Sequence, residues 1–303
     1  MATPATVGFV GLGNMGEPMS GRLVDAGHAV LGVDPTPAAA AAATARGVTV
    51  VDSAADLARQ TDVVILMLPN SDVVDAVAGQ LLAVPAAERQ VRTVIDMSSS
   101  EPSRTRALAE RLQAEGIVLV DAPVSGGVLG AVKGELTIMV GGPVDTVGEL
   151  GALLGVLGSR VVRVGDAGAG HAVKALNNLL SATHLLATNE AAIVAAKFGV
   201  DPGLMMSVVN TSSGRSGSSE LKLPKYVFTG AFDSGFAAAL LEKDVGIAHR
   251  LAQEVGVDLT IGSVVDEHWH ALNAELPPGS DHTAIIKPLE ERYGIQIRPV
   301  APE

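Results

Sequence analysis

Short runs rich in β-branched residues alternate with helix-length segments through the first half of this chain. Eight runs read as strands, at residues 7–10, 29–34, 48–51, 63–68, 91–97, 117–120, 136–140 and 160–164. The run at 63–68 is apolar at every position, which is typical of a strand covered on both faces in a parallel sheet. Helical segments such as 15–26 and 102–115 lie between the runs. This order predicts βαβ crossovers and an open, doubly wound α/β sheet.

The strand pattern nearly disappears after Asp166. Residues 171–198 form one long helical pattern, and further helical patterns follow at 202–209, 238–255 and 262–276. We therefore expect a Rossmann domain over residues 1–166 and an all-α domain over residues 167–303. A long helix at about 170–198 is expected to join them.

Composition excludes several classes of function. The chain has 303 residues, 48% of them hydrophobic, which suits two folded domains. A net charge of −12 and 3% aromatic residues argue against a nucleic-acid or membrane-surface partner. Cysteine is absent, so thiolate chemistry is excluded. No uninterrupted apolar run approaches the ~20 residues of a membrane span, and the N-terminus does not resemble a secretory signal, so we expect a cytoplasmic protein.

A glycine-rich turn follows the first expected strand and opens the first expected helix. It reads Gly11, Leu12, Gly13, Asn14, Met15 and Gly16. The first glycine suits a tight turn, the second lets the backbone approach a pyrophosphate, and the third allows close packing of helix and strand. The N–H groups at the helix N-terminus would face the anion. The turn therefore predicts a dinucleotide site, with a purely structural glycine turn as the alternative.

Asp34 ends the second expected strand, 23 residues after Gly11. An acidic residue at this place accepts hydrogen bonds from the adenosine ribose and repels a 2′-phosphate. The next three residues include no Arg or Lys. The sequence therefore favours NAD over NADP as cofactor.

Polar residues end two more of the expected strands. Leu68, Pro69 and Asn70 end the fourth strand, and Ser98, Ser99 and Ser100 end the fifth. Ligands in open α/β sheets lie beyond the carboxyl ends of strands, which favours contact with the cofactor. The alternative is ordinary capping, with Ser100 as the N-cap of the helix that begins at Pro102.

Residues 121–127 form a second glycine-rich motif. Ser125 is followed directly by Gly126 and Gly127. Consecutive backbone N–H groups beside a hydroxyl can hold a small carboxylate. Spacing alone leaves a substrate loop and a structural turn equally acceptable.

The third motif opens the long expected helix. Gly170, Lys174, Asn177 and Asn178 fall on one face of that helix. A desolvated amine there could act as a general acid/base, its pKa lowered from the ordinary ~10.4. The alternative is a solvated stripe with an extended lysine side chain.

With these motifs the chain resembles the β-hydroxyacid dehydrogenases, a family that includes 3-hydroxyisobutyrate dehydrogenase and tartronate semialdehyde (2-hydroxy-3-oxopropionate) reductase. The likeness covers nearly all of the chain. It rests on four motifs in one order, at residues 8–16, 121–127, 168–178 and 243–244, and the stretch 210–215 looks like the hydroxyisobutyrate branch. The resemblance implies an NAD(P)-dependent oxidoreductase with a 6-phosphogluconate dehydrogenase-like C-terminal domain, acting on a short 3-hydroxy acid or a sulfonated analogue.

The same resemblance implies roles for individual residues. Lys174 would be the catalytic acid/base, assisted by Asn178. Ser125, Gly126 and Gly127 would hold the substrate carboxylate, and Lys243 would close over nicotinamide and substrate. The cofactor would be lined by Leu68, Pro69 and Ser99, the last standing where relatives often have Thr. Family members form dimers or tetramers through the helical domain, so a homo-oligomer is expected.

Other interpretations of the sequence stay open at this point. A non-catalytic NAD-binding scaffold or sensor would have no reason to keep Lys174 with Asn178. Imine reductases share the architecture but commonly have another residue at the lysine position. His268 and His270, two apart on a helix, point in different directions, so no metal site is expected. Arg215 could pair with a substrate carboxylate or be a solvated loop charge.

Overall fold

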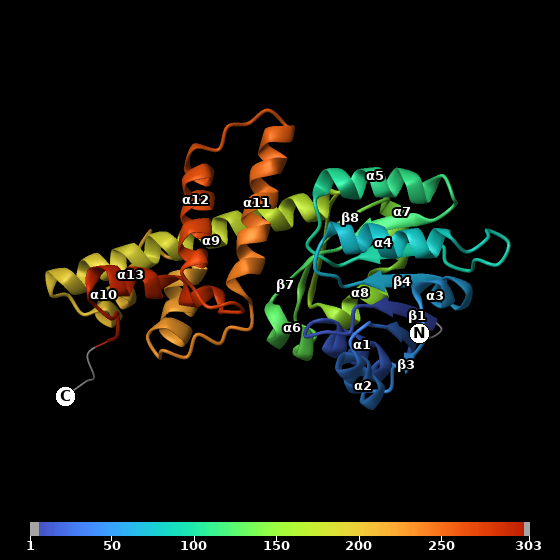
Figure 1. Cartoon of the computed structure of the whole chain (residues 1–303), viewed down its shortest axis with the longest axis horizontal. Helices are drawn as coiled ribbons and strands as arrows, with labels where there is room; N and C mark the ends of the chain where they lie inside the picture. The colour runs from blue at the N-terminus through green and yellow to red at the C-terminus, as the bar shows by residue number, and fades with distance from the viewer. Residues whose placement is uncertain (1–5, 300–303) are drawn as a thin grey trace. The chain divides into compact units, whose positions relative to one another are not determined.

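The computed structural model describes residues 6–299. The chain forms two compact units, residues 1–174 and 175–303. The division falls inside one long helix, α9 (Ala169–Phe198). Figure 1 shows a sheet with its flanking helices in the first unit and helices in the second. The expected fold class, a Rossmann domain followed by a helical domain, is confirmed.

The first unit contains one nine-stranded sheet. Its strands are β1 (Thr6–Val10), β2 (Ala29–Val33), β3 (Thr49–Val50), β4 (Val63–Leu66), β5 (Thr93–Asp96), β6 (Val118–Asp121), β7 (Val124–Ser125), β8 (Thr137–Gly141) and β9 (Arg160–Gly165). The order is β3-β2-β1-β4-β5-β6-β8-β7, with β9 paired to β8. All pairs from β3 to β6 are parallel, whereas β8 runs antiparallel to β6 and β7. The sheet is thus mainly parallel, and β7 was not expected from the sequence.

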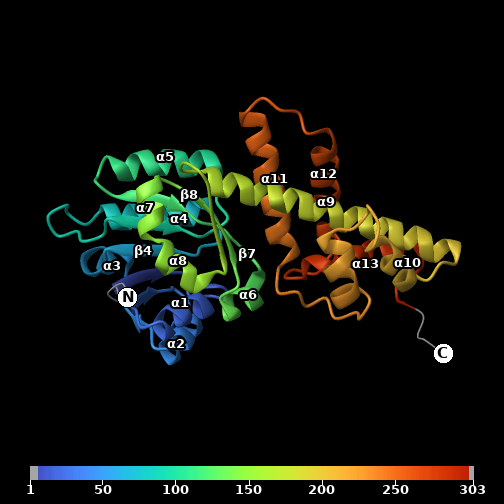
Figure 2. The ribbon, with the colours of Figure 1, turned by 180° about the vertical axis from the view of Figure 1, so that it is seen from behind.

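Helices cover both faces of this sheet (Figures 1 and 2). One face packs against α1 (Gly16–Asp25), α2 (Pro37–Ala45), α6 (Gly127–Lys133), α7 (Val144–Glu149) and α8 (Gly151–Leu157). The other packs against α3 (Ala54–Gln60), α4 (Ser71–Leu82) and α5 (Pro102–Gln113). Within β4, Ile65 joins the first core and its neighbours Val64 and Leu66 join the second. Alternate side chains of a strand point to opposite faces, so burial of both explains the continuous apolar run.

The second unit is helical apart from one isolated bridge among its described residues. It contains most of α9, then α10 (Pro202–Val209), the π-helix η1 (Ser218–Val227), α11 (Ala238–Glu254), α12 (Thr260–Ala274), the 3₁₀ helix η2 (His282–Ile286) and α13 (Lys287–Tyr293). Trp269, with no exposed surface, lies in its core with residues from α9, α11 and η1. The Ser/Gly-rich stretch at residues 210–219 leads into η1, a helix that contains Pro224.

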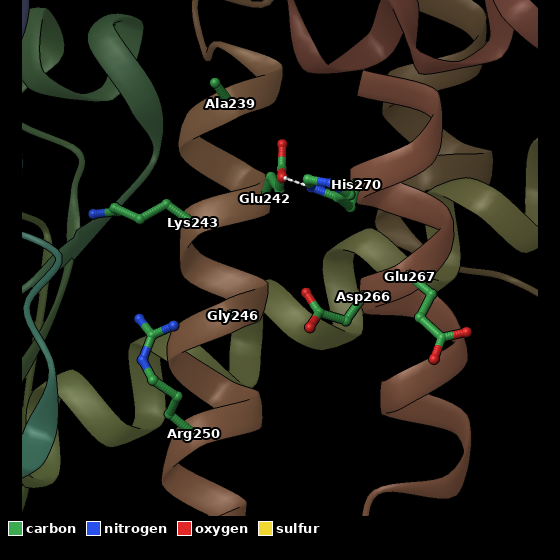
Figure 3. Close-up of a pocket in the computed structure, with 8 residues that line it drawn as sticks. All are labelled: Ala239, Glu242, Lys243, Gly246, Arg250, Asp266, Glu267 and His270. Atoms are coloured by element: carbon green, nitrogen blue, oxygen red, sulfur yellow. Dashed lines mark hydrogen bonds and ion pairs between the residues drawn. The ribbon is translucent and has the colours of Figure 1, made fainter. Parts of the chain in front are cut away.

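Helices α11 and α12 pack side by side in this unit. Figure 3 shows Glu242 of α11 pointing toward His270 of α12, and their Oε1 and Nδ1 atoms are 2.7 Å apart. A groove of about 540 Å³ runs along the pair. In the same view Lys243 points away from α12. Glu242, Lys243 and His270 all line this groove.

Helix α9 is also long and apolar enough to cross a membrane, judged by length and composition alone. Core helices of water-soluble proteins pass the same test. In this chain Ala182, Leu185, Leu186, Ala192 and Ile193 of α9 pack in the core of the second unit.

Candidate functional site

The carboxyl ends of five parallel strands form one row. Register pairs Val33 with Val10, Val10 with Leu66, Leu66 with Asp96, and Asp96 with Asp121. The loops that follow these residues therefore leave the sheet at one edge. The strand order reverses between β1 and β4, where ligands bind in doubly wound sheets.

The glycine turn lies at this reversal. Gly11 has φ of +94°, and a Cβ there would lie 2.2 Å from the Met67 carbonyl oxygen. A Cβ on Gly16 would lie 1.8 Å from the Gly11 carbonyl oxygen. Gly13 differs, because a Cβ there would meet no atom within 4 Å. The chain's own packing thus requires glycine at two positions, while the space above Gly13 suits a closely approaching ligand such as a pyrophosphate.

The first turn of α1 supports the same ligand. Its N-cap residue, Met15, makes no side-chain hydrogen bond to the helix. Asn14 is exposed and Leu12 is buried, with 1% of its surface exposed. The N-terminal N–H groups of a helix lack internal partners, so they can bind an anion. The Leu12 side chain belongs to the core, so only its backbone could contact such a ligand.

Asp34 follows β2 and binds the glycine turn. Its Oδ2 accepts a hydrogen bond from the Leu12 N–H at 2.7 Å, and its Oδ1 accepts one from the Thr36 N–H at 2.8 Å. A carboxylate has about four acceptor positions, so two backbone bonds leave capacity for ribose hydroxyls. Asp34 is thereby fixed at the place where the sequence predicted the ribose.

The loops after β4 and β5 are joined through Ser98. Its Oγ accepts a hydrogen bond from the Leu68 N–H at 2.9 Å. Pro69 is exposed and Ser99 is partly exposed, both at the edge of the sheet. The alternative role of Ser100 as a helix cap is wrong: its hydroxyl donates to Asp96 Oδ2 at 2.8 Å, and the N-cap of α5 is Glu101.

The substrate loop expected after β6 has the conformation that only glycine adopts freely. Gly126 has φ of +133° and Gly127 has φ of +61°. Both are exposed, and the preceding Ser125 is partly exposed at the end of β7. Hydroxyl and backbone N–H groups are therefore accessible together, as carboxylate binding requires.

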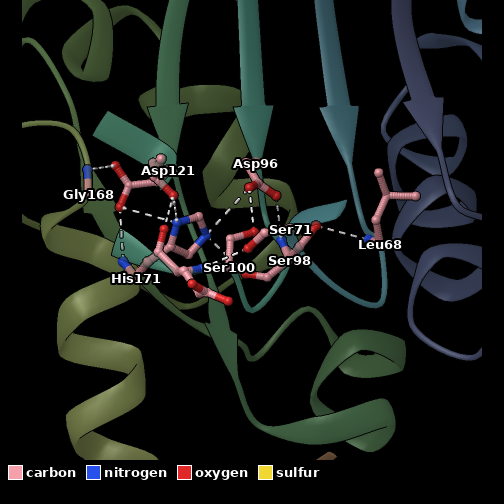
Figure 4. Close-up of polar contacts among 10 residues, drawn as sticks. Leu68, Ser71, Asp96, Ser98, Ser100, Asp121, Gly168 and His171 are labelled. Atoms are coloured by element: carbon pink, nitrogen blue, oxygen red, sulfur yellow. Dashed lines mark hydrogen bonds and ion pairs between the residues drawn. The ribbon is translucent and has the colours of Figure 1, made fainter. Parts of the chain in front are cut away.

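Asp121 fixes the beginning of α9 in the first unit. Its Oδ1 accepts a hydrogen bond from the Gly168 N–H at 2.7 Å and its Oδ2 accepts one from the His171 N–H at 2.9 Å (Figure 4). A Cβ on Gly170 would lie 2.8 Å from Asp121 Oδ2 and 2.4 Å from the Met139 carbonyl oxygen. A carboxylate at a helix N-terminus satisfies unpaired N–H groups and interacts favourably with the helix dipole.

Lys174 is the last residue of the first unit and lies on α9, one turn before Asn178. In the second unit Asn178 is buried and its Nδ2 donates to Asp244 Oδ2 at 2.6 Å. Lys243 Nζ lies 3.2 Å from Asp244 Oδ1. Only the NH₂ group of an amide can donate to a carboxylate, so Asp244 fixes which way the Asn178 amide faces.

The remaining candidates lie elsewhere. Arg215 is exposed on the loop after α10. His268 Nδ1 lies 2.9 Å from the Val264 carbonyl oxygen, whereas His270 pairs with Glu242. The two imidazoles therefore have different neighbours. In the part of the chain that the structure describes, no three His, Asp or Glu side chains are grouped as metal ligands.

Sequence reasoning assigned no role to Asp96, His171 or Asp244. Asp96 and Asp121 each end an apolar run, and a charge inside a buried strand was a usable signal. Asp244 stood beside Lys243 in a recognised motif. Nothing in the sequence indicated that the ring of His171 is enclosed.

The fold and this edge define a class: a nicotinamide-dinucleotide-binding domain followed by a helical domain. Two family models match the chain. The NAD binding domain of 6-phosphogluconate dehydrogenase matches residues 6–165, and the NAD-binding domain of NADP-dependent 3-hydroxyisobutyrate dehydrogenase matches residues 168–289.

Several known proteins are similar to this chain over nearly its whole length. 2-(Hydroxymethyl)glutarate dehydrogenase of Eubacterium barkeri is 36% identical over 291 residues, covering 96% of this chain and 97% of that protein. Human mitochondrial 3-hydroxyisobutyrate dehydrogenase is 35% identical, covering 96% and 88%. The structure of the Mycobacterium tuberculosis 3-hydroxyisobutyrate dehydrogenase with L-serine has a TM-score of 0.88 at 34% identity, covering 95% and 99%.

The chain belongs to the 3-hydroxyisobutyrate dehydrogenase family of the β-hydroxyacid dehydrogenases. It is an NAD(P)-dependent oxidoreductase that acts on a CH–OH group.

Proposed function

We propose that this enzyme interconverts a 2-substituted 3-hydroxypropanoate and its semialdehyde. The names 3-hydroxyisobutyrate and 2-(hydroxymethyl)glutarate, carried by relatives at 35% and 36% identity, both denote such acids and differ in the group on C2. Reduction of 2-hydroxy-3-oxopropionate is the alternative within the same chemistry. The bond from buried Asn178 to Asp244, beside Lys243 and one turn after Lys174, carries the proposal.

Each residue has a defined task in the reaction. The bound nicotinamide supplies the hydride acceptor. Lys174 takes the hydroxyl proton while negative charge develops on that oxygen. Asn178 assists the lysine from one turn further along α9. Its amide is held by two hydrogen bonds, because Nδ2 donates to Asp244 Oδ2 and Oδ1 accepts from Asn177 Nδ2 at 3.1 Å. Ser125, Gly126 and Gly127 hold the carboxylate and thereby orient the reacting carbon.

Turnover by purified protein with a panel of short 3-hydroxy acids tests this proposal. Lys174→Ala should lower kcat by about 10²–10⁴-fold, the usual contribution of a general acid/base, and leave the Kd for NAD within about twofold. Lys197→Ala, an exposed lysine on the same helix, is the matched control and should keep full activity. Unchanged turnover in Lys174→Ala would refute the assigned role.

We further propose NAD as the preferred cofactor. Asp34 is held at the end of β2, and Pro35, Thr36 and Pro37 offer no cation for a 2′-phosphate. Asp34→Asn, which removes the charge but keeps an oxygen acceptor, should lower the ratio of kcat/KM for NAD over NADP by about tenfold, roughly 1.4 kcal/mol. A ratio that stays constant would contradict the assignment.

A homo-oligomer formed through the helical unit is also proposed. Exposed apolar side chains gather near the end of α9 and on α10: Val194 is 67% exposed, Phe198 85% and Leu204 65%. Together with Tyr293, Val194 and Phe198 line a hollow of about 610 Å³. Light scattering after size exclusion should give a multimeric mass for the wild type and a lower mass for Phe198→Asp. A monomeric wild type would refute the proposal.

A further inference from the structure

The imidazole of His171 is enclosed inside the first unit, and the chemistry above does not use it. The residue is 1% exposed and lies on the first turn of α9, three residues before Lys174. Its Nε2 lies 3.1 Å from the Ser98 carbonyl oxygen and its Nδ1 lies 2.8 Å from the Thr105 hydroxyl (Figure 4). Both ring nitrogens therefore contact groups outside α9.

One of these two hydrogen bonds has a fixed direction. A carbonyl oxygen only accepts, so Nε2 carries a proton and donates to Ser98. The Thr105 hydroxyl also lies 3.1 Å from the Glu101 carbonyl oxygen and can give its one proton to either neighbour. The bond from Nε2 to Ser98 is thus present whichever way the Thr105 hydroxyl turns.

Ser98 is the residue that joins the loops expected to line the cofactor. Its hydroxyl accepts from the Leu68 N–H, its own N–H donates to Asp96 Oδ1 at 3.0 Å, and Ser99 follows it. These bonds hold the loops after β4 and β5 without help from α9. His171 adds the connection from those loops to the helix that bears Lys174.

The first turn of α9 needs such a connection. The first four N–H groups of a helix have no partner within it. Asp121 accepts two N–H groups near this end, at Gly168 and His171. These bonds fix where the helix begins, and the His171 ring adds a second attachment on the side facing β5. Two attachments, one to β6 and one to the loop after β5, fix the rotation of the turn about the helix axis.

We propose that His171 is a positioning residue that sets Lys174 relative to the cofactor loops through its hydrogen bond to the Ser98 carbonyl. The proposal rests on the function assigned above. A displacement of about 1 Å in a reacting group can cost about 10²-fold in rate. The loops after β4 and β5 keep their own bonds, so the defect on losing this contact falls on kcat and leaves NAD binding intact.

Three substitutions separate the two contacts of the ring. The amide nitrogen of Gln can reach the place of Nε2, and that of Asn the place of Nδ1. His171→Gln should keep kcat within about threefold, whereas His171→Asn and His171→Leu should lose about 10–100-fold. The Kd for NAD should stay within threefold in all three. With substrate deuterated at the reacting carbon, the isotope effect on kcat should rise in the Asn and Leu variants, because proton and hydride transfer become rate-limiting.

Hydrogen exchange supplies a readout that does not depend on activity. Amides of the peptide covering residues 168–176 should exchange about tenfold faster in His171→Asn and His171→Leu, and at the wild-type rate in His171→Gln. Thr61→Val is the matched control, since Thr61 is buried in the same unit and its hydroxyl bonds only the Leu57 carbonyl oxygen in the structure. It should change neither kcat nor this peptide.

The outcomes separate the two proposals. Wild-type kcat and exchange in His171→Leu would overturn the positioning role, as would equal losses in the Gln, Asn and Leu variants. A wild-type enzyme that oxidises no 3-hydroxy acid would refute the proposed function, and exchange in residues 168–176 would still decide whether His171 fixes this turn.

Discussion

In the first unit, a connected cluster of buried polar side chains lies where β5 and β6 end and α9 begins. Asp96, Ser98, Asp121 and His171 are each at most 1% exposed, and hydrogen bonds connect them to neighbouring loops. In the second unit, buried polar groups lie at separate places: Asn178 with Asp244, His282 with Ser234 and Asp281, and Asn189 within the core.

The difference indicates two structural roles for buried polar side chains. A connected cluster holds several backbone segments in one arrangement, since each group has lost water and depends on its partners. An isolated pair affects only its own surroundings. Substitutions in this cluster of the first unit should therefore disturb several backbone segments at once, and substitutions in the second unit should act on local chemistry, pH response or packing.

The largest effect is expected for Asp121→Asn. One carboxylate oxygen becomes an NH₂ group that faces a backbone N–H group, so a buried donor at the start of α9 loses its acceptor. Breaking such a buried charged contact costs about 3–5 kcal/mol. Urea unfolding followed by circular dichroism measures this free energy. Asp166→Asn, an exposed carboxylate close to the same helix end, should cost less than about 0.5 kcal/mol. Equal costs for the two variants would remove the distinction drawn for the first unit.

A pH effect comes next, from His282 in the second unit. Burial first, and then the positive charge of Lys222, lower the pKa of His282 to about 4, while Asp281 and the Phe236 carbonyl oxygen act in the opposite direction. A folded-state pKa below the unfolded ~6.5 gives stability that is fully present above pH 6.5 and is lost as pH falls toward 4. The loss should amount to about 2–3 kcal/mol.

The measurement is the free energy of unfolding between pH 6.5 and 4.5, followed by fluorescence of Trp269, the one tryptophan of the chain. Asp281 stays ionised in this range because its pKa is lowered: burial raises the pKa, but hydrogen bonds from Thr283 and Ser234 lower it by more. His282→Asn should flatten the profile, and exposed His184→Asn should leave it unchanged. Identical slopes for wild type and His282→Asn would contradict the explanation.

Asp244→Asn should act on catalysis more than on folding. Loss of the charge weakens the contact with Lys243 and frees the Asn178 amide to rotate. We expect kcat to fall about 10–100-fold, which corresponds to about 1.4–2.7 kcal/mol in the barrier. Glu267→Gln, an exposed carboxylate on α12, is the control and should keep the wild-type rate. A change confined to KM would instead place Asp244 in substrate binding.

Sequence predicted one unit better than the other. The apolar run at 63–68 and the glycine turn specify buried parallel strands and a helix start, because both follow from local backbone rules. The direction of β8 is not encoded in apolar alternation, which is the same for parallel and antiparallel neighbours. The helix η1 escaped detection because Ser, Gly and Pro224 indicate a loop, whereas burial of Leu223 and Val227 in the core overrides them.

The residues of the candidate site could be predicted where a functional residue stands in a motif with a required backbone conformation or spacing. Gly13, Asp34 and Lys174 stand in motifs whose spacing follows from the geometry of the site, so each could be identified from the sequence. The contacts of His171 with Ser98 and Thr105 join residues 66 to 73 positions apart. Such contacts depend on how the start of α9 packs against the end of β5, and no local sequence pattern specifies that packing.

The smallest effect is expected in the core of the second unit, at Asn189. This residue of α9 has no exposed surface, and neither polar atom of its side chain has a hydrogen-bond partner among residues 6–299. A buried amide without partners is destabilising relative to an apolar side chain of similar size. Asn189→Leu should therefore raise the free energy of unfolding of this unit by about 1 kcal/mol, measured by the fluorescence of Trp269. Asn178→Leu should lower it, because Oδ2 of the buried Asp244 would lose its hydrogen-bond donor. Opposite signs at two asparagines of one helix would establish that partners, and not burial alone, decide what a polar side chain contributes here; a loss of stability in both would show that Asn189 is bonded in solution.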